Sequence, residues 1–560
     1  MARILTLHHP DQALVHYQAK VWQSDTMYQL ARRHAVERGR SFSLRDAHRR
    51  LTWSQVVSWV DALAQDLETA GLRSGDRVSV WLPNRLEATV AFLACSRNGY
   101  ICNPSLHQNY TVEEIKVLLN SIGARALITQ PGWGADSTRA SIFAAAADIP
   151  SLKRVYALPS LNSGAAPLPS DATEFPALPS VGVGPTDFST PSSDPDQIVY
   201  LAFTSGTTGR PKAVMHSDNT LLANGRTMVA DWGHGSDTVL LSLSPMSHHI
   251  GTVALEQALV AGCELVVLDP SAGIVAIDWI HDTGATYVMG VPTHAMDLLH
   301  VAEQQGLTQL GSVRVFYLAG SPIPSETARK LMALGAKPQN VYGMTENGSH
   351  QYTKPTDSPE VITSTCGKAC KGYEIKLWNQ ENPDIEATPG EIGEIGGRGG
   401  LLMLGYFGNQ LATESSFNSS GWFMSGDLGK FDENGNLQIV GRKKDLIIRG
   451  GHNIHPARVE DLAHRHPRVK KAAAFAVADE RLGEKVCLAI IADGQAPTGD
   501  ELLNHLAEVG LSKFDMPEYY IALDSMPLTA SGKILKRELV EWARIGKLQP
   551  QPVRYQGKSQ

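Results

Sequence analysis

Cysteine is scarce in this chain of 560 residues, and no two of its cysteines form a Cys-x-x-Cys pair. Cys366 and Cys370 have three residues between them, but no second pair lies near enough in the sequence to complete a zinc site. The pattern therefore argues against both a zinc finger and a disulfide-stapled fold. We expect reduced thiols, mostly in buried packing, at Cys95, Cys102, Cys263, Cys366, Cys370 and Cys487.

Long apolar runs and a surplus of basic charge are missing as well. No stretch approaches the ~20 apolar residues of a membrane span, and the first apolar run breaks too early for a signal-peptide core. With 42% hydrophobic residues, 19% charged residues and a net charge of −7, the composition is typical of a soluble globular protein and indicates no nucleic-acid partner. We expect a cytoplasmic protein of several domains and leave a homodimer open.

Residues 204–212 stand out because they combine hydroxyl side chains, two glycines and a lysine. They follow an apolar, strand-like run, and the cap-type residues Ser217, Asp218 and Asn219 then open a helix-like segment. A loop between a strand and a helix can direct backbone N–H groups at an anion, and glycine permits the close approach. We predict a phosphate-holding loop made of Thr204, Ser205, Gly206, Thr207, Thr208, Gly209 and Lys212.

This loop is not a Walker A motif, which has its lysine directly after the second glycine. Here Arg210 and Pro211 stand between Gly209 and Lys212, so a P-loop NTPase is disfavoured. Taken alone, the loop could also be a hydrophilic connection, because turns are rich in glycine and threonine. Motifs elsewhere in the chain are needed to decide between these interpretations.

Four such motifs follow in order, and with the loop they span more than 300 residues: Tyr342-Gly343-Met344-Thr345-Glu346, Ser425-Gly426-Asp427, Gly441-Arg442-Lys443-Lys444-Asp445 and Pro527-Leu528-Thr529-Ala530-Ser531-Gly532-Lys533. Together with the loop, they resemble the signatures of the adenylate-forming superfamily, which comprises acyl-CoA synthetases, peptide-synthetase adenylation domains and firefly luciferase. Residues 441–456 look most like those of medium-chain, alicyclic and aryl acyl-CoA ligases. The resemblance implies an enzyme that activates a carboxylic acid with ATP.

Alternating strand-like and helix-like patterns predict an α/β fold. We expect a large N-terminal domain, residues 1–441, of layered mixed sheets and helices with a smaller β-rich unit near residues 390–405. A charge cluster at residues 442–445 indicates a boundary, after which a small α+β C-terminal domain fills residues 442–560. The resemblance implies that this second domain is mobile about a hinge at Lys444.

The resemblance also implies how ATP and Mg²⁺ are held. The loop would hold the β- and γ-phosphates, while Glu346, a hard oxygen ligand, suits Mg²⁺. Thr345 would donate a hydrogen bond to the α-phosphate, and Tyr342 with Gly343 and Met344 would face adenine. The segment lining the other side of the base would be Gly320, Ser321 and Pro322. Taken singly, Glu346 could be an ordinary surface carboxylate.

The other motif residues are assigned in the same way. Asp427 and Arg442 would meet the ribose, Lys533 would stabilise the carboxylate and α-phosphate during adenylation, and His248 would gate the approach of the acid. Gly450 and Gly451 would leave room for the pantetheine arm of coenzyme A. Each assignment has a plainer alternative. Asp427 could stabilise its turn, Arg442 could belong to a solvated basic face and Lys533 could simply be solvated. His248 could be a structural histidine, and Gly450-Gly451 could be an ordinary turn.

The motifs say less about which carboxylic acid is activated and which molecule accepts the acyl group. Amino-acid-activating relatives place an aspartate near the His248 segment, but residues 244–257 contain only Glu256 as an acid, which favours a simple carboxylate. Pocket candidates that are small or apolar suit a hydrophobic acid of modest size: Ile250, Gly320, Met344 and Gly348. Only 27 residues follow Lys533, so free coenzyme A is the expected acceptor. A separate carrier protein and a non-catalytic nucleotide-binding homologue remain the alternatives.

One departure from the family concerns the coenzyme A nucleotide. Relatives often carry basic residues after the position of Phe514, whereas this chain has Asp515 and Met516. The 3′-phosphate must therefore find its cations elsewhere. A local basic cluster could serve, although a solvated face is the plainer interpretation: Arg465, Arg468, Lys470 and Lys471.

Overall fold

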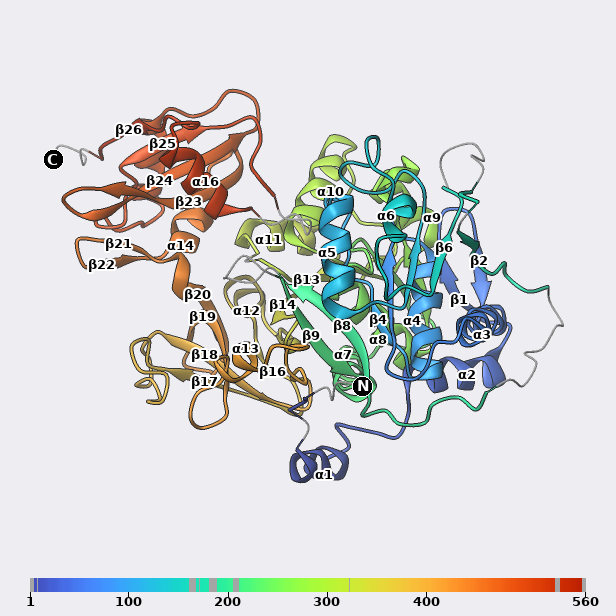
Figure 1. The fold of residues 1–560 in the computed structure, drawn as a ribbon. Helices are drawn as coiled ribbons and strands as arrows, with labels where there is room; N and C mark the ends of the chain where they lie inside the picture. The colour runs from blue at the N-terminus through green and yellow to red at the C-terminus, as the bar shows by residue number, and fades with distance from the viewer. Residues whose placement is uncertain are drawn as a thin grey trace.

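The computed structural model describes residues 5–7, 9–160, 168–170, 172–180, 189–204, 211–321, 323–528 and 534–555. Four β-sheets and their covering helices make up these ranges, which confirms the α/β class. The seven-stranded and nine-stranded sheets build the main body. The four-stranded and six-stranded sheets follow one another toward the C-terminal side of the molecule (Figure 1).

The seven-stranded sheet has the order β7-β6-β5-β3-β4-β8-β9, and only its last pair, β8 and β9, is antiparallel. Connecting helices begin at regular caps, as at Thr52 and Thr111, whose side chains each take part in a capping box. The strands are β3 (Arg77–Trp81), β4 (Ile101–Asn103), β5 (Ala126–Thr129), β6 (Arg154–Ala157), β7 (Thr173–Glu174), β8 (Ile198–Thr204) and β9 (Lys212–Ser217). The helices that precede or connect them are α1 (Pro10–Gln18), α2 (Met27–Arg38), α3 (Trp53–Thr69), α4 (Leu86–Asn98), α5 (Val112–Ile122) and α6 (Ile142–Ala146).

The predicted phosphate loop has a different setting from the one expected. It joins two antiparallel strands, with Thr204 at the end of β8 paired to Lys212 at the start of β9. Helix α7 (Asp218–Trp232) begins only after β9, at a capping box of Ser217 and Thr220. The helix start predicted at Ser217 is confirmed, but the loop does not lead directly into that helix, because the mostly buried residues 212–217 form a strand that the sequence pattern did not predict.

The nine-stranded sheet has the order β16-β15-β14-β13-β12-β10-β11-β1-β2. Its strands from β14 to β1 run parallel, so their carboxyl ends meet at one edge, where ligand sites of parallel sheets form. The strands are β1 (Phe42–Arg45), β2 (Arg50–Thr52), β10 (Val239–Ser242), β11 (Glu264–Val267), β12 (Tyr287–Gly290), β13 (Val315–Leu318), β14 (Lys337–Met344), β15 (Gly348–Tyr352) and β16 (Lys368–Ala369). The associated helices are α8 (His249–Ala261), η1 (Pro270–Ala272), α9 (Ala276–Thr283), α10 (Pro292–Gln304), α11 (Ser325–Ala333) and α12 (Pro359–Ser364).

The two large sheets share a hydrophobic core. One buried cluster contains Val78 of β3, Tyr200 of β8, Leu240 of β10 and Tyr317 of β13, together with residues of α4, α7 and α8. Helices α7 and α8 pack closely, because Gly225 of α7 has no Cβ and lies directly against Glu256 of α8. This arrangement brings the ends of β8 and of the parallel strands into one region.

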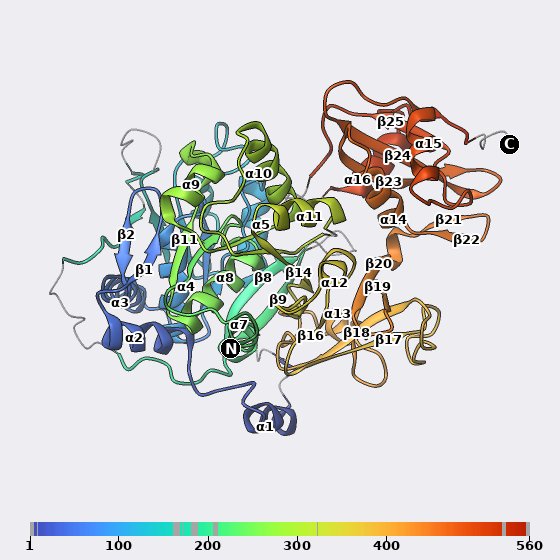
Figure 2. The same ribbon diagram turned by 180° about the vertical axis from the view of Figure 1, so that it is seen from behind.

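The β-rich unit predicted near residues 390–405 is a four-stranded antiparallel sheet of β17 (Tyr373–Trp378), β18 (Gly393–Gly399), β19 (Phe423–Phe431) and β20 (Leu437–Arg442), with α13 (Gln410–Glu414) beside it. The 3₁₀ turn η2 (Lys443–Asp445) then leads to a six-stranded sheet, seen from behind in Figure 2. Its strands are β21 (Ile447–Arg449), β22 (His452–Ile454), β23 (Val469–Asp479), β24 (Gly483–Ala492), β25 (Tyr519–Ala522) and β26 (Gln551–Pro552), and its helices are α14 (Pro456–Ala463), α15 (Gly499–Glu508) and α16 (Lys536–Arg544).

All six cysteines are buried and unpaired, as the sequence predicted. Burial raises the pKa of thiols such as Cys263 and Cys366 to about 12, so they keep their protons at neutral pH. Among the described residues, no helix combines the length and the apolar character that crossing a membrane requires.

Candidate active site

The Thr345-Glu346 turn lies at the carboxyl end of β14. Strands β14 and β15 form a hairpin in which Met344 pairs with Gly348. The Met344 amide donates a 3.1 Å hydrogen bond to Asn347 Oδ1, which closes the turn around the two predicted site residues. Both side chains are half-buried. The turn therefore presents a hydroxyl and a carboxylate at the edge where the parallel strands end.

Tyr406 joins this turn to the strand that follows the phosphate loop. Its hydroxyl donates a 2.9 Å hydrogen bond to Glu346 Oε1, and Lys212 Nζ lies 4.6 Å from the centre of its ring. The Tyr406 backbone is held by a bridge to Val214 and by a 3.0 Å hydrogen bond from its amide to Thr413 Oγ1. Two motifs far apart in the sequence thus meet through a residue that belongs to neither.

The electrostatics of Glu346 reflect this setting. Burial raises the pKa of its carboxyl group, while the Tyr406 hydroxyl and the Lys212 ammonium oppose that rise. Burial and the Glu346 charge raise the pKa of Tyr406, so its hydroxyl keeps the proton that it donates. Among the described residues, no group of three or more His, Cys, Asp or Glu side chains could hold a metal ion, and Glu346 is a single carboxylate.

His216 supports the same turn from β9. Its Nε2 lies 2.7 Å from the carbonyl oxygen of Thr345, which can only accept, so Nε2 carries the proton and Nδ1 faces the Thr220 hydroxyl at 3.0 Å. Burial lowers the pKa of His216 to about 4, which keeps the ring neutral at pH 7. His249 stacks on it with centroids 5.7 Å apart and places Nδ1 3.3 Å from the Tyr200 hydroxyl.

Asp427 forms a second centre on β19. Arg442 on the neighbouring strand β20 pairs with it and places Nε 2.9 Å from Asp427 Oδ1. The Tyr342 hydroxyl donates a 3.0 Å hydrogen bond to Asp427 Oδ2. The Asp427 side chain is 7% exposed and that of Arg442 is 47% exposed. Since Tyr342 lies on β14, which ends at Met344 just before Thr345, the Asp427 centre connects to the Glu346 turn through a single strand.

Gly320 and Ser321 lie just past the carboxyl end of β13, the strand that pairs with β14. Gly320 has φ +93°, a left-handed conformation that favours glycine, and Ser321 is exposed. The structure therefore brings the predicted adenine segment to the same sheet edge as Tyr342, Gly343 and Met344.

His248 caps the N-terminal end of α8, beyond β10 of the same sheet. Its ring stacks on that of His107 with centroids 4.4 Å apart and an interplanar angle of 23°. Ile250, a pocket candidate, is half-buried in the first turn of α8. The predicted acid gate thus lies beyond the same carboxyl ends as the nucleotide residues.

Some predicted residues lie outside the described ranges, and only their neighbours can be placed. Thr204 and Lys212 flank the phosphate loop, and a bridge between Leu528 and Ile534 flanks the lysine motif just before α16. The predicted residues outside the described ranges are Ser205, Gly206, Thr207, Thr208, Gly209, Pro322 and Lys533.

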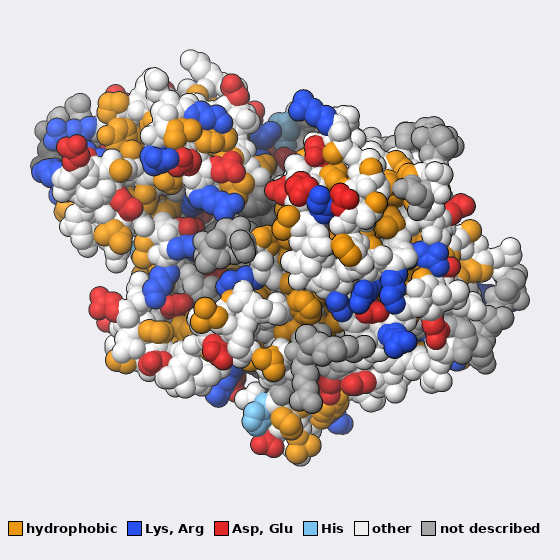
Figure 3. Space-filling view, in the orientation of Figure 1, with side chains coloured by type: hydrophobic (Ala, Val, Ile, Leu, Met, Phe, Trp, Pro, Cys, Tyr) orange, Lys and Arg blue, Asp and Glu red, His pale blue; other side chains and the backbone are white. Residues whose placement is uncertain are grey.

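The predicted hinge lies between the four-stranded and six-stranded sheets, and the predicted hairpin joins the first two strands of the six-stranded sheet. Lys444 is exposed in η2, and its neighbour Lys443 donates a 2.9 Å hydrogen bond to Glu394 of the four-stranded sheet. Gly450 and Gly451 form the tight turn between β21 and β22, with φ +58° and +85°. Figure 3 shows Lys and Arg side chains along the hollow between this part of the molecule and the main body.

Acidic partners neutralise much of the basic charge near this hairpin. His452 Nε2 lies 2.7 Å from Asp515 Oδ1, and Arg449 pairs with Glu518. In the cluster considered for the 3′-phosphate, Arg465 pairs with Asp461 at 2.9 Å and Arg468 with Glu501 at 2.9 Å. These ion pairs weaken the case for that cluster as a phosphate site.

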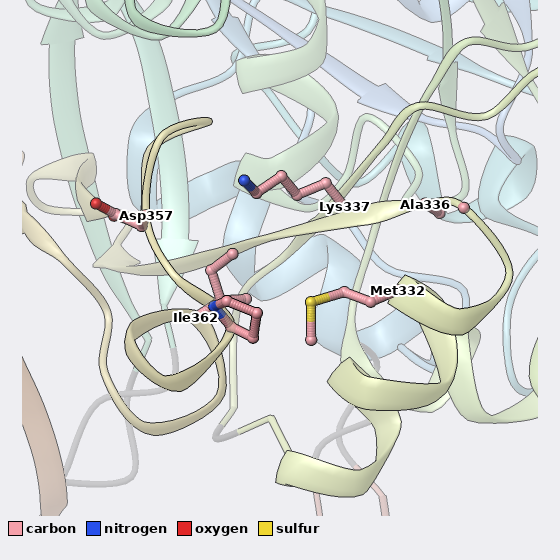
Figure 4. A pocket seen from close by; sticks show the side chains of 7 residues that line it. Met332, Ala336, Lys337, Asp357 and Ile362 are labelled. Atoms are coloured by element: carbon pink, nitrogen blue, oxygen red, sulfur yellow. The ribbon is translucent and has the colours of Figure 1, made fainter.

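A separate hollow of about 200 Å³ lies between α11 and α12, at the beginning of β14 rather than at its end. Met332, Ala336, Lys337, Asp357 and Ile362 line it (Figure 4). Since none of the predicted site residues contributes to this hollow, we do not assign it to the active site.

Comparison with known proteins agrees with this geometry. The model of the family described as AMP-binding enzyme matches residues 30–407, and that of the AMP-binding enzyme C-terminal domain matches residues 458–533. The chain belongs to the AMP-binding enzyme family. The resemblance inferred from the five motifs is confirmed, because these matches span most of the sequence between residues 30 and 533.

Relatives with stated activities cover nearly the whole chain. The medium-chain fatty-acid–CoA ligase of Escherichia coli K12 is 30% identical over 489 residues, covering 87% of this chain and 84% of the relative. The human mitochondrial medium-chain acyl-CoA ligase ACSF2 is 30% identical over 526 residues, covering 88% and 83%. The 2,3-dihydroxybenzoate-AMP ligase of Bacillus subtilis is 27% identical over 538 residues, covering 95% and 96%.

A solved structure supports the fold in the same way. The crystal structure of ATP-bound MatB from Rhodopseudomonas palustris superposes with a TM-score of 0.80 and 28% identity, covering 93% of this chain and all of that one. The large and small parts of the chain thus correspond to those of an adenylate-forming enzyme.

Sequence reasoning missed three residues that the structure brings to the site: Tyr406, His216 and His107. Tyr406 follows a glycine-rich run, and His216 interrupts an otherwise apolar strand, which are signals that a search for polar residues near motifs could have used. His107 has no such signal, because its stacking partner His248 is far away in the sequence, at the start of α8.

Proposed function

We propose that this protein is an AMP-forming acid:CoA ligase, which activates a carboxylic acid with ATP and passes the acyl group to coenzyme A. One observation carries the proposal: Tyr406 contacts both Lys212, next to the phosphate loop, and Glu346, the proposed metal ligand. Membership in the AMP-binding enzyme family supports the same reaction, as do relatives that are medium-chain acyl-CoA ligases.

In the first step, a carboxylate oxygen of the acid bonds to the α-phosphorus of ATP. The bond from that phosphorus to the bridging oxygen breaks, and pyrophosphate leaves. Negative charge grows on the departing phosphates, so fixed donors and cations must face them. We assign this task to Lys212 and to the loop that starts at Thr204, and we assign the α-phosphate to the Thr345 hydroxyl. Lys533 would stabilise the charge that shifts between carboxylate and phosphate.

We assign Mg²⁺ to Glu346. The donor set fits, because Mg²⁺ at nucleotide sites is bound through one or two carboxylates, with phosphates and waters completing its shell. Tyr406 occupies Oε1 of Glu346, which leaves Oε2 for the ion. When bound, the ion would neutralise phosphate charge. The Tyr406 hydrogen bond would fix the direction in which the carboxylate faces.

Asp427 and Arg442 are our candidates for the ribose. Tyr342 donates a hydrogen bond to Oδ2 of Asp427 and Arg442 forms an ion pair with Oδ1, and each oxygen retains lone pairs for a ribose hydroxyl. Adenine would lie between the segment of Tyr342 and that of Gly320 and Ser321. The ion pair with Arg442 would fix the direction in which the carboxylate faces before ATP arrives.

In the second step, the thiol sulfur of coenzyme A bonds to the acyl carbon, the bond from that carbon to AMP breaks, and the thiol proton is released. We propose that residues 442–560 rotate about Lys444 between the two steps. The rotation would remove Lys533 from the site and bring up the hairpin of Gly450 and Gly451. A turn without side chains would leave space for the narrow pantetheine arm.

For the acid, we propose a hydrophobic carboxylate of medium-chain, alicyclic or aromatic type. The apolar half-buried Ile250 beside His248 suits such a substrate. The relatives bracket this range, since two act on medium-chain acids and one is named for 2,3-dihydroxybenzoate. A cytoplasmic location, expected from the sequence alone, stays part of the proposal, and a homodimer stays open.

Acid-dependent exchange of pyrophosphate into ATP tests the first step. A panel of straight-chain, cyclohexyl and aromatic carboxylates, assayed with and without coenzyme A, should give exchange with some acids and thioester only when coenzyme A is added. Lys533→Ala should abolish exchange while ATP binding persists. Unchanged exchange in Lys533→Ala would refute the lysine assignment, and adenylation without thioester formation would point to a carrier-protein acceptor. ATP binding without exchange for any acid would favour the non-catalytic homologue.

A further inference from the structure

His107 makes the most distinctive contact of the predicted acid gate. It follows β4, in the seven-stranded sheet, whereas His248 caps α8 of the nine-stranded sheet. The two rings are stacked, with centroids 4.4 Å apart and planes at 23°. Tyr110 lies on the same loop, with its ring centre 5.5 Å from that of His107. The contact therefore spans the junction of the two large sheets.

The loop that carries His107 is firmly anchored. The Trp81 indole donates a 2.9 Å hydrogen bond to the His107 carbonyl. Two residues earlier, Ser105 Oγ accepts a 2.6 Å hydrogen bond from the amide of Phe203, the residue before Thr204. His107 is thus fixed relative to the end of β8, where the phosphate loop begins.

The chemistry of the ring suits stacking rather than proton transfer. Burial, with a smaller contribution from His248, lowers the pKa of His107 to about 3, so the ring stays neutral at physiological pH. Its Nδ1 is buried and has no hydrogen-bond partner in the described part of the chain. A neutral ring can lie flat on a second imidazole without charge repulsion, and it adds no cation to compete for the carboxylate.

We propose that His107 is a positioning residue, which holds the ring of His248 by stacking so that its edge faces the arriving carboxylate. This role rests on the proposed function of the site. The backbone of His248 is fixed by the first turn of α8, whereas the direction of its ring is set by rotations about χ1 and χ2. A planar neighbour restricts those rotations, and less entropy is then lost when the acid binds.

Leucine and phenylalanine at position 107 separate stacking from simple filling of space. His107→Phe keeps a flat ring, whereas His107→Leu fills similar volume without one. We expect His107→Leu to raise the KM for the acid about 3- to 10-fold, with kcat of pyrophosphate exchange and the KM for ATP changed less than about twofold. His107→Phe should restore the acid KM. His300→Leu, on the exposed side of α10, is the matched control and should match the wild type.

Three outcomes would count against this role. An unchanged acid KM in His107→Leu overturns it, and so does an acid KM in His107→Phe that is as high as in His107→Leu. Equal losses in acid KM, ATP KM and melting temperature would show a structural effect alone and would also overturn it. If the wild type shows no acid-dependent exchange, the proposed function fails and the positioning role fails with it.

Discussion

Tyr406 donates a 2.9 Å hydrogen bond to the carboxylate of Glu346, although 60 residues separate them in the sequence. The same ring faces Lys212 at 4.6 Å, so one side chain contacts the proposed metal ligand and the cation beside the phosphate loop. A phenol has the two features that this needs, a hydroxyl donor and a π-face that attracts cations.

Tyr406→Phe tests the hydrogen bond alone, because the ring that faces Lys212 is kept. A hydrogen bond to a charged group contributes about 1.5–3 kcal/mol, so we expect kcat/KM for MgATP to fall about tenfold or more. The Mg²⁺ concentration that gives half-maximal exchange should rise as well. Tyr406→Leu, which also removes the ring, should lose more. Wild-type values in Tyr406→Phe would show that Glu346 is held without this bond.

Asp427→Asn removes the charge that pairs with Arg442 while preserving the shape of the side chain. We expect the KM for ATP to rise about tenfold or more, because a ribose diol binds a carboxylate better than an amide. Stability should change by less than about 1 kcal/mol, since Arg442 is half-exposed.

A matched control for Asp427 exists in the same sheet. Glu374 of β17 pairs with Arg398 across β18 at 2.8 Å, the same kind of cross-strand ion pair outside the proposed site. Glu374→Gln should leave the KM for ATP unchanged. Equal effects of the two substitutions would mean that Asp427 serves the sheet and not the ribose.

Gly451→Leu tests the hairpin assigned to coenzyme A. A leucine there would project into the space proposed for pantetheine, so the thioester step should slow about tenfold or more while pyrophosphate exchange persists. Gly494→Leu controls for backbone strain, because Gly494 also has a positive φ, +74° against +85°, and also has open space around it. If both variants lose thioester formation equally, strain and not steric block is the cause.

Glu256→Gln tests a buried carboxyl group that both large sheets surround. Neither carboxylate oxygen of Glu256 has a hydrogen-bond partner among the described residues, and burial raises its pKa well above the usual value. Above pH 4.5 the unfolded chain loses this proton while the folded chain keeps it. The free energy of unfolding therefore falls as pH rises toward the folded pKa. Glu256→Gln should raise the urea midpoint at pH 8 and change it little near pH 4.5.

Glu87 provides the opposite case for the same measurement. Arg85 and Arg49 donate hydrogen bonds of 2.8–3.0 Å to it, and their charges lower its pKa to about 2 despite burial. Its stabilising contribution is present above pH 4.5 and is lost as pH falls toward 2. Glu87→Gln should thus lower the urea midpoint at pH 8. The corresponding loss in the free energy of unfolding should be about 3 kcal/mol or more. Shifts of the same sign in both variants would contradict this account.

Much of the fold was predictable, because local patterns determine local structure. The apolar runs at residues 264–268 and 472–477 have strand-like sequences and correspond to β11 and β23, and Thr498 with Glu501 has the pattern of a capping box and begins α15. The strand β9 was missed since it follows the loop directly, and a short apolar run between a lysine and a cap gives a weak signal. The pair of Asp461 and Arg465 is local, four residues apart at the C-terminal end of α14, but the sequence could not show that Arg468 pairs with Glu501, because that depends on tertiary packing.

Short-range spacing alone predicted the proposed chemistry of this protein: the glycines and hydroxyls at 204–209, the Thr345-Glu346 pair, the turn before Asp427 and the lysine motif at 533 place donors and acceptors within a few residues of one another. Only the tertiary structure decided which of these groups meet. Tyr406 reaches Glu346, His216 reaches Thr345 and His107 stacks on His248 because strand order and helix packing bring distant segments to one sheet edge. Burial at that edge then shifts the pKa values of Glu346, Tyr406, His216 and His107, which no local pattern encodes.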